Sequence, residues 1–317
     1  MMVFILGGIF LDSDKELIVE NSKGSVQNAA DAFQKSIIRS LNCASSDVVF
    51  INFPFVGSFP DKFKKLLFPK KESIFQGNHV FCIPFVNLFG YKNLSRLFGA
   101  LKSFLRFNSV DSVFLIYSAH APFLLAALVA RLLLNDFKFI VIVPDLPEYM
   151  SDKVGFFRQR LVNFNNWVLG LSIRYSRGVI GLTIKMAERL GVDEQKYLTW
   201  EGCAQTDSDA VPEVHLDLPN KFVFYSGGLN SRYGVEMLID AFIEVSDPEY
   251  FLVLCGTGDL EEKIGELSVI PDSRILFLGQ VRRELALGIQ RKASFLVNPR
   301  LPFDDFTKYS FPSKTLE

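Results

Sequence analysis

A strand pattern followed by a helical pattern recurs through residues 222–299, and this repetition constrains the fold most strongly. Each copy begins with an apolar run rich in β-branched and aromatic residues and passes through a glycine-bearing turn before its helical part. The copies are 222–242 (FVFYSGGLNSRYGVEMLIDAF), 251–264 (FLVLCGTGDLEEKI) and 275–299. Such units form a parallel sheet, whose ligands bind at the carboxyl ends of the strands. The repetition therefore predicts an α/β fold with a Rossmann-like parallel sheet.

Residues 1–200 show the same alternation more weakly. A helical pattern covers 26–41, and apolar strand patterns occupy 1–6, 47–53, 112–118, 139–143 and 178–182. A length of 317 residues with 49% hydrophobic residues favours two domains, each with its own core. Periodicity is lost in the polar, proline-containing stretch 201–220. We therefore expect an amino-terminal domain at 1–202, a linker at 203–220 and a carboxyl-terminal domain at 221–317.

The stretch Ser112–Ala130 contains no charged residue and could span a membrane on length alone. Its first half is β-branched and aromatic, and His120 and Pro122 interrupt it before a helical pattern begins. We expect a strand, a loop and a buried helix instead. The four cysteines lie far apart without metal-binding spacing, which is typical of free thiols in a reducing compartment such as the cytoplasm.

Charge is divided unevenly along the chain. Residues 1–200 hold 23 Lys+Arg against 16 Asp+Glu, whereas residues 201–317 hold 11 against 19. In 62–71 and 87–107, cations interleave with Phe and Leu in the manner of basic amphipathic helices. Such helices either lie on an anionic membrane surface or are ordinary half-buried helices. We expect a cytoplasmic protein, peripheral at the inner face of the cell membrane, with no nucleic-acid partner.

The stretch 300–317 (RLPFDDFTKYSFPSKTLE) completes a set of segments whose order and spacing resemble a known family. The chain resembles retaining glycosyltransferases of GT-B architecture, family 4, and in its YSFPSKTLE string the bacterial exopolysaccharide branch. The resemblance implies two Rossmann-like domains, a nucleotide-diphosphate sugar donor, and a saccharide or lipid-linked acceptor. It also implies a hexosyltransferase without a metal, and a second domain that is truncated after Glu317.

Sugar transfer from such a donor requires stabilisation of the departing diphosphate, which cations and backbone N–H groups at helix starts can supply. No cofactor or metal is expected, since the acidic pair Asp304-Asp305 is a weak metal motif. By the resemblance and this chemistry, the predicted catalytic residues are His120, Arg300 and Lys308. The predicted donor-binding residues are Gly227, Gly228, Gly256, Gly258, Gly279, Tyr309, Ser310, Ser313, Lys314 and Glu317.

The chain departs from the wider family at three positions. The family's Arg and Lys in the first glycine turn correspond to Gly228 and Tyr233, and the first of its two glutamates corresponds to Tyr309. We expect Arg300 and Lys308 to take over from the missing cations. A phenol can donate a hydrogen bond but carries no charge at neutral pH.

Three alternatives remain at this stage. One is a non-catalytic homologue that binds a sugar nucleotide, and another is a GT-B sugar-nucleotide epimerase. A dinucleotide-dependent oxidoreductase is disfavoured, because GTGDLE at 256–261 has Glu261 where the fingerprint requires its third glycine.

Overall fold

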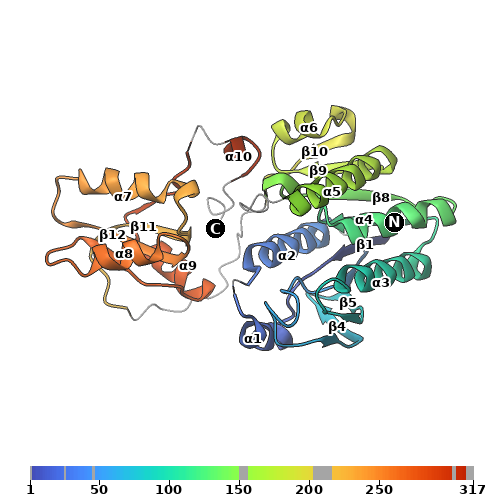
Figure 1. Ribbon diagram of the computed structural model, residues 1–317, viewed down its shortest axis with the longest axis horizontal. Coiled ribbons are helices and arrows are strands. Elements are labelled where there is room, and N and C mark those ends of the chain that lie inside the picture. Colours follow the sequence, from blue (N-terminus) through green and yellow to red (C-terminus); the bar gives the residue numbers. More distant parts are fainter. Residues whose placement is uncertain are drawn as a thin grey trace. The chain divides into compact units, whose positions relative to one another are not determined.

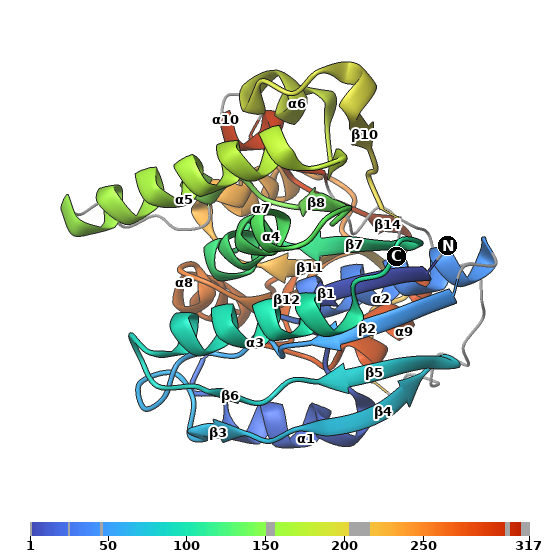
Figure 2. The ribbon, with the colours of Figure 1, turned by 90° about the vertical axis from the view of Figure 1, so that its right-hand side faces the viewer.

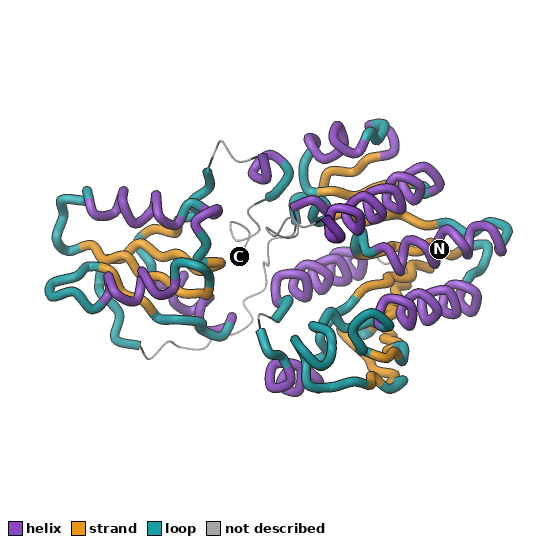
Figure 3. The backbone as a smooth tube through the Cα atoms, in the orientation of Figure 1, coloured by secondary structure: helices purple, strands orange, loops and turns teal. Residues whose placement is uncertain are grey.

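The computed structural model divides the chain into two compact units, 1–203 and 204–317, which are described separately here. Figure 3 distinguishes the described residues, which are 2–24, 26–44, 47–149, 156–202, 216–301 and 305–311. Of the predicted linker 203–220, residues 203–215 lie outside this set.

The first unit is built on an eight-stranded sheet in the order β10-β9-β8-β7-β1-β2-β5-β4. Neighbouring strands are parallel, except that β4 is antiparallel to β5. A separate antiparallel pair joins β3 to β6. The strands are β1 (Met2–Gly7), β2 (Asp47–Asn52), β3 (Leu67–Phe68), β4 (Lys71–Phe75), β5 (Asn78–Cys82), β6 (Phe85–Val86), β7 (Ser112–Tyr117), β8 (Phe139–Val143), β9 (Gly178–Gly181) and β10 (Tyr197–Thr199).

Helices cover both faces of this sheet, which explains why its central strands are apolar without alternation. Figure 2 shows α3, α4 and α5 side by side in front of the sheet. Two short 3₁₀ turns occupy Pro147–Tyr149 and Glu194–Lys196. The helices are α1 (Asp12–Asn21), α2 (Asn28–Cys43), α3 (Lys92–Phe107), α4 (Ala121–Leu133), α5 (Phe156–Tyr175) and α6 (Ile184–Leu190).

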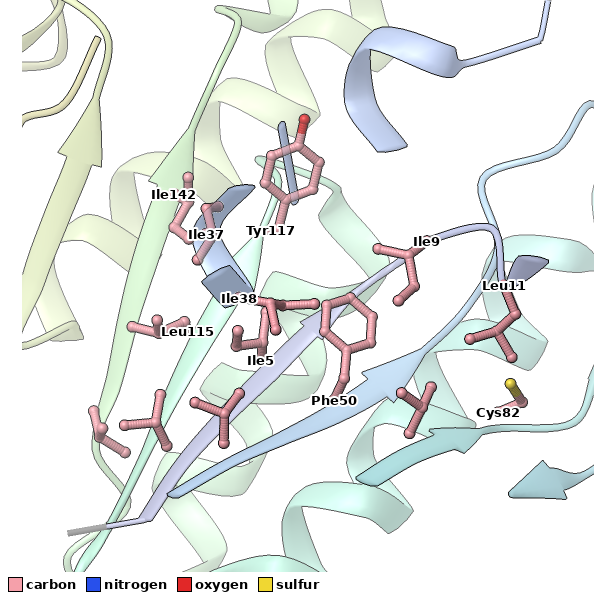
Figure 4. Packing of buried hydrophobic residues seen from close by; sticks show 14 residues of the cluster. Ile5, Ile9, Leu11, Ile37, Ile38, Phe50, Cys82, Leu115, Tyr117 and Ile142 are labelled. Atoms are coloured by element: carbon pink, nitrogen blue, oxygen red, sulfur yellow. The ribbon is translucent and has the colours of Figure 1, made fainter. Parts of the chain in front are cut away.

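Alternate residues of β1 supply the two cores of the first unit. Ile5 packs with Ile37 and Ile38 of α2, as Figure 4 shows. Phe4 points the other way and stacks on Phe114, with ring centroids 5.0 Å apart. Burial of these large side chains, each worth about 1.5 to 3 kcal/mol, holds the sheet between its helix layers.

The second unit has a four-stranded parallel sheet in the order β13-β12-β11-β14. Buried clusters lie on both faces of it, one against α7 and α8 and the other against α9. Figure 1 shows β11 and β12 with these helices around them. The strands are β11 (Lys221–Gly228), β12 (Tyr250–Thr257), β13 (Ile275–Phe277) and β14 (Phe295–Leu296). The helices are α7 (Val235–Ile243), α8 (Glu261–Ser268), α9 (Arg283–Lys292) and α10 (Asp305–Lys308), with a 3₁₀ turn at Ser231–Tyr233.

The predicted strand, loop and buried helix at Ser112–Ala130 are confirmed as β7, a loop and α4. None of the helices in the described part of the chain has the length and apolarity that crossing a bilayer requires. Two buried cysteines, Cys82 and Cys255, carry free thiols as expected.

The expected basic helix at 62–71 is wrong. This segment consists of turns and the short strand β3. Phe63 is buried with Phe10 and Ile18, and Phe68 stacks on Phe85 at 4.5 Å between ring centroids. Tertiary contacts of the aromatic residues therefore override the helical spacing of the lysines.

Candidate functional site

The glycine turns of the second unit come together at the carboxyl ends of its strands. The register pairs Gly227 of β11 with Gly256 of β12, so both strands end side by side. The N–H of Gly256 donates to the carbonyl oxygen of Gly279 at 2.9 Å, which joins the turn after β13 to the same edge. Gly228 and Gly258 follow directly in the first two turns. All five predicted glycines therefore lie at one edge of the sheet.

Close backbone packing accounts for several of these glycines without a ligand. Gly256 has φ +139°, and a Cβ added there would lie 1.7 Å from the carbonyl oxygen of Gly227. A Cβ on Gly258 would lie 2.2 Å from the oxygen of Leu229. At Gly279 the positive φ of 64° alone favours glycine, because no atom lies within 4 Å of an added Cβ.

Arg300 approaches this edge from the loop after β14. Its backbone nitrogen lies 3.4 Å from the Cβ position of Gly234, the residue that precedes α7. Its Nη1 donates to Oγ of Ser310 at 2.6 Å, so two predicted site residues are in contact. Burial raises the pKa of Tyr225 to about 12, against the opposing effect of the Arg300 charge. The Tyr225 hydroxyl donates to the oxygen of Gly228 at 2.9 Å. Arg300 thus lies beside the first glycine turn and the start of α7.

The other predicted residues of this loop are placed in part. Lys308 is exposed at the end of α10, and the half-buried Tyr309 follows it. Ser313, Lys314 and Glu317 lie outside the described residues.

His120 lies at the corresponding carboxyl edge of the first unit, between β7 and α4. Its ring packs edge-on against Phe123, with centroids 4.9 Å apart, and against Phe55 at 6.3 Å. Its Nε2 is buried and has no hydrogen-bond partner among the described residues. Burial, with smaller contributions from the Arg96 and Lys92 charges, lowers the pKa of His120 to about 3. The imidazole is therefore neutral near pH 7.

Lys92 and Arg96, two cations of the predicted amphipathic helix, are buried beside His120. They are only 9% and 3% exposed. Arg96 Nη2 donates to the oxygen of Pro54 at 2.6 Å, and Lys92 Nζ donates to the oxygen of Val56. Burial lowers the pKa of Lys92 to about 7, with Arg96 adding to the shift, and that of Arg96 to about 9.

The buried side of α3 follows the four-residue spacing of a helix face. Lys92, Arg96 and Ala100 recur every four residues and share the buried side, which Phe104 continues. The sequence pattern leaves open whether the cations of this segment face a membrane surface or belong to a half-buried helix. The Arg96 guanidinium lies over the ring of Phe85, 4.7 Å from its centroid. A desolvated guanidinium can gain about 2 kcal/mol from such a contact. The spacing of hydrophobic residues in the sequence does not reveal that this contact forms.

Polar residues also follow two further strands of the first unit, β8 and β9. Asp145 follows β8, and burial raises the pKa of its carboxyl group. Glu148 is held by Arg189, whose Nη2 lies 2.8 Å from Oε1 of the carboxylate. Thr183 caps α6 by accepting from the N–H of Met186 at 3.3 Å. Within the described ranges no three His, Cys, Asp or Glu side chains are grouped as a metal site would require.

No protein-family model matches the chain, and no curated protein matches it in sequence. Solved structures do match over almost its whole length. The catalytic domain of starch synthase IV from Arabidopsis thaliana, bound to ADP and acarbose, superposes with a TM-score of 0.62 at 10% identity, covering 95% of this chain and 78% of that one. Sucrose-phosphate synthase from Thermosynechococcus elongatus superposes with a TM-score of 0.61 at 14% identity, and the match covers 96% of this chain and 77% of that one. The lipopolysaccharide outer core galactosyltransferase WaaB superposes with a TM-score of 0.55 at 14% identity, and the match covers 92% of this chain and 71% of that one.

Two parallel-sheet α/β units and these similarities define the fold as GT-B, as the sequence predicted. The three similar proteins are synthases and a transferase that act on sugars. At such low identity the similarity establishes the architecture, and the chemistry has to be argued from the residues of this chain.

Proposed function

We propose that this chain is a glycosyltransferase that moves a hexose, with retention, from a nucleotide-diphosphate sugar to a saccharide or lipid-linked acceptor. The observation that carries the proposal is the position of Arg300, held by Ser310 beside the glycine turn that starts α7. The setting is cell-surface polysaccharide synthesis of the bacterial exopolysaccharide branch of family 4. The amino-terminal domain is proposed to work at the inner face of the cell membrane.

The proposed chemistry is charge stabilisation of the leaving diphosphate. Arg300 supplies a cation, and the first N–H groups of α7 point their partial positive charge at the same edge. Lys308 and Lys314 would add to this field, so no metal is required. Removal of one such donor typically costs about 2.7 to 4 kcal/mol of transition-state stabilisation.

Sugar and nucleotide contacts are assigned to neutral groups and one carboxylate. Since His120 is neutral at pH 7, its role is a hydrogen bond to a sugar hydroxyl and not charge compensation. Tyr309 would donate to a sugar or phosphate oxygen, with Ser313 nearby in the same string. Glu317 would accept from the ribose. The glycine turns let the backbone approach the donor closely.

A second candidate is a non-catalytic protein that binds a sugar nucleotide. Gly228 and Tyr233 stand where the wider family has its two cations, and the Tyr233 ring fills the space beside Gly228. In addition, one amino group of Arg300 already donates a hydrogen bond to Ser310, so it is not free to bind a diphosphate unless that bond breaks. A GT-B epimerase would differ from both candidates by turning over donor without an acceptor.

Calorimetry and thermal shift with UDP-, ADP-, GDP-, TDP- and CDP-sugars, without added metal, test the proposal. One nucleotide class should bind, and Arg300→Ala should weaken that binding. The matched control is Arg291→Ala, an exposed cation at the far end of α9. Donor turnover that is unchanged in Arg300→Ala and Lys308→Ala would contradict the site. Binding without turnover would favour the second candidate, and no binding at all would contradict both.

A further inference from the structure

The helix layer formed by α3, α4 and α5 contains no acidic residue. These helices have 16, 13 and 20 residues, and none is Asp or Glu, although the chain has 35 acidic residues in 317. In contrast, α1 on its own carries four carboxylates. The acid-free layer is continuous, since α3 packs beside α4 and α4 beside α5 (Figure 2).

Large apolar side chains line the outer side of α3. Leu94, Phe98 and Leu105 are 46%, 59% and 45% exposed. At 100° per residue they lie opposite Arg96 and Ala100, which are buried. A soluble monomer exposes single apolar residues commonly, but an aligned row of three marks an interaction surface.

Exposed cations border this apolar row. Lys102 and Arg106 follow one side of it on α3, and Arg131 lies at the end of the neighbouring α4, beside Leu132, which is 85% exposed. The nearest carboxylates along the chain are Asp111 and Asp136, in the loops that follow the two helices. We call the following set the outer face: Leu94, Phe98, Lys102, Leu105, Arg106 and Arg131.

We propose that the outer face docks on an anionic lipid bilayer, with its apolar row at the acyl boundary and its cations among the headgroups. An apolar helix side that is bordered by Lys and Arg suits this interface, because burial of the row and attraction to anionic lipids act together. The complete lack of acidic residues in the layer removes the repulsion that would oppose such a surface.

The proposal restricts the membrane-facing cations of α3 to Lys102 and Arg106. The sequence pattern pointed to every cation of 87–107, but Lys92 and Arg96 bind backbone oxygens inside the protein. The lysine-rich segment 62–71 is not a helix. Docking extends the membrane part of the proposed function and does not depend on sugar transfer, because it is measured without any substrate.

Cosedimentation of the full chain with phosphatidylcholine vesicles, with and without phosphatidylglycerol, tests the proposal. The chain should bind only the anionic vesicles. Lys102→Gln with Arg106→Gln should weaken binding about 25-fold, from about fivefold per cation near the surface. Phe98→Ser with Leu105→Ser should weaken it about tenfold or more. High salt should reduce the loss of binding caused by Lys102→Gln with Arg106→Gln, but should not change the loss caused by Phe98→Ser with Leu105→Ser.

The matched control is Ile184→Ser with Lys185→Gln on α6, which packs against β9 near the other edge of the sheet; Ile184 is 48% exposed and Lys185 pairs with Glu188. All substituted positions are at the surface, so melting temperatures should stay unchanged. Equal binding to both vesicle types, or none to either, would overturn the proposal. It would also fail if only the control weakened binding. A dimer in size-exclusion chromatography that Phe98→Ser dissociates would show that a second copy covers this face instead.

Discussion

Replacement of Gly256 by alanine should destabilise the second unit whether or not a ligand is bound. The residue has φ +139°, a region that L side chains rarely adopt. An added Cβ would lie 1.7 Å from the carbonyl oxygen of Gly227, an atom of the paired strand. Since this neighbour is backbone, no side-chain rotation can relieve the overlap.

Two costs add in the Gly256→Ala variant. A strained backbone conformation costs about 1 to 3 kcal/mol. Shifting packed strands to admit a methyl group costs about another 1 to 3 kcal/mol. The expected loss is therefore about 2 to 6 kcal/mol, against a total of about 5 to 15 kcal/mol for a typical protein. Gly265→Ala in α8 is the matched control, because a Cβ there meets nothing within 4 Å. It should stabilise the domain by about 0.5 to 1 kcal/mol.

The assay has to report on the second unit alone. Both tryptophans, Trp167 and Trp200, belong to the first unit, so their fluorescence would miss the change. Urea unfolding followed by far-UV circular dichroism, with hydrogen exchange of peptides from β11 and β12, gives the required signal. A loss below about 1 kcal/mol would refute the reasoning. If donor binding then vanished in a folded Gly256→Ala protein, the glycine would serve the ligand and not the packing.

Three further predictions concern buried polar groups. His120 has a folded pKa of about 3, below the unfolded value of 6.5, so the unfolded chain gains a proton first as pH falls. The unfolding free energy should therefore drop by about 1.4 kcal/mol per pH unit between about pH 6 and 3, and His120→Gln should lack this part of the slope in urea titrations. The buried Lys92 should also make stability fall as pH is lowered, but at higher pH. Its pKa is about 7 in the folded chain and 10.5 in the unfolded chain, so the unfolding free energy should decrease as pH is lowered from about 10 to 7. Lys92→Met should abolish this decrease. Tyr225→Phe removes the hydrogen bond to Gly228 and should cost about 1 kcal/mol by circular dichroism. Unchanged profiles or an unchanged midpoint would contradict these assignments.

The sequence alone predicted the recurring strand–helix units, although not the strands β3 to β6. The strand patterns at 139–143 and 178–182 became β8 and β9, and the three glycine-bearing copies became β11 to β13 with α7 to α9. These features depend on residues close in the chain, since an apolar period and a glycine turn are local properties. The convergence of the five glycines also follows, because parallel strands end at one edge of a sheet.

Only the tertiary structure decided which polar groups lie inside. Lys92 and Arg96 read as solvated cations until the chain after β2 supplies the oxygens of Pro54 and Val56, some forty residues away. Gly256 needs no side chain because Gly227, distant in sequence, lies against it. The exposure of Leu94, Phe98 and Leu105 follows from the same contacts, because they lie on the side of α3 opposite the buried Arg96. Burial and hydrogen bonding depend on contacts between segments that are distant in sequence.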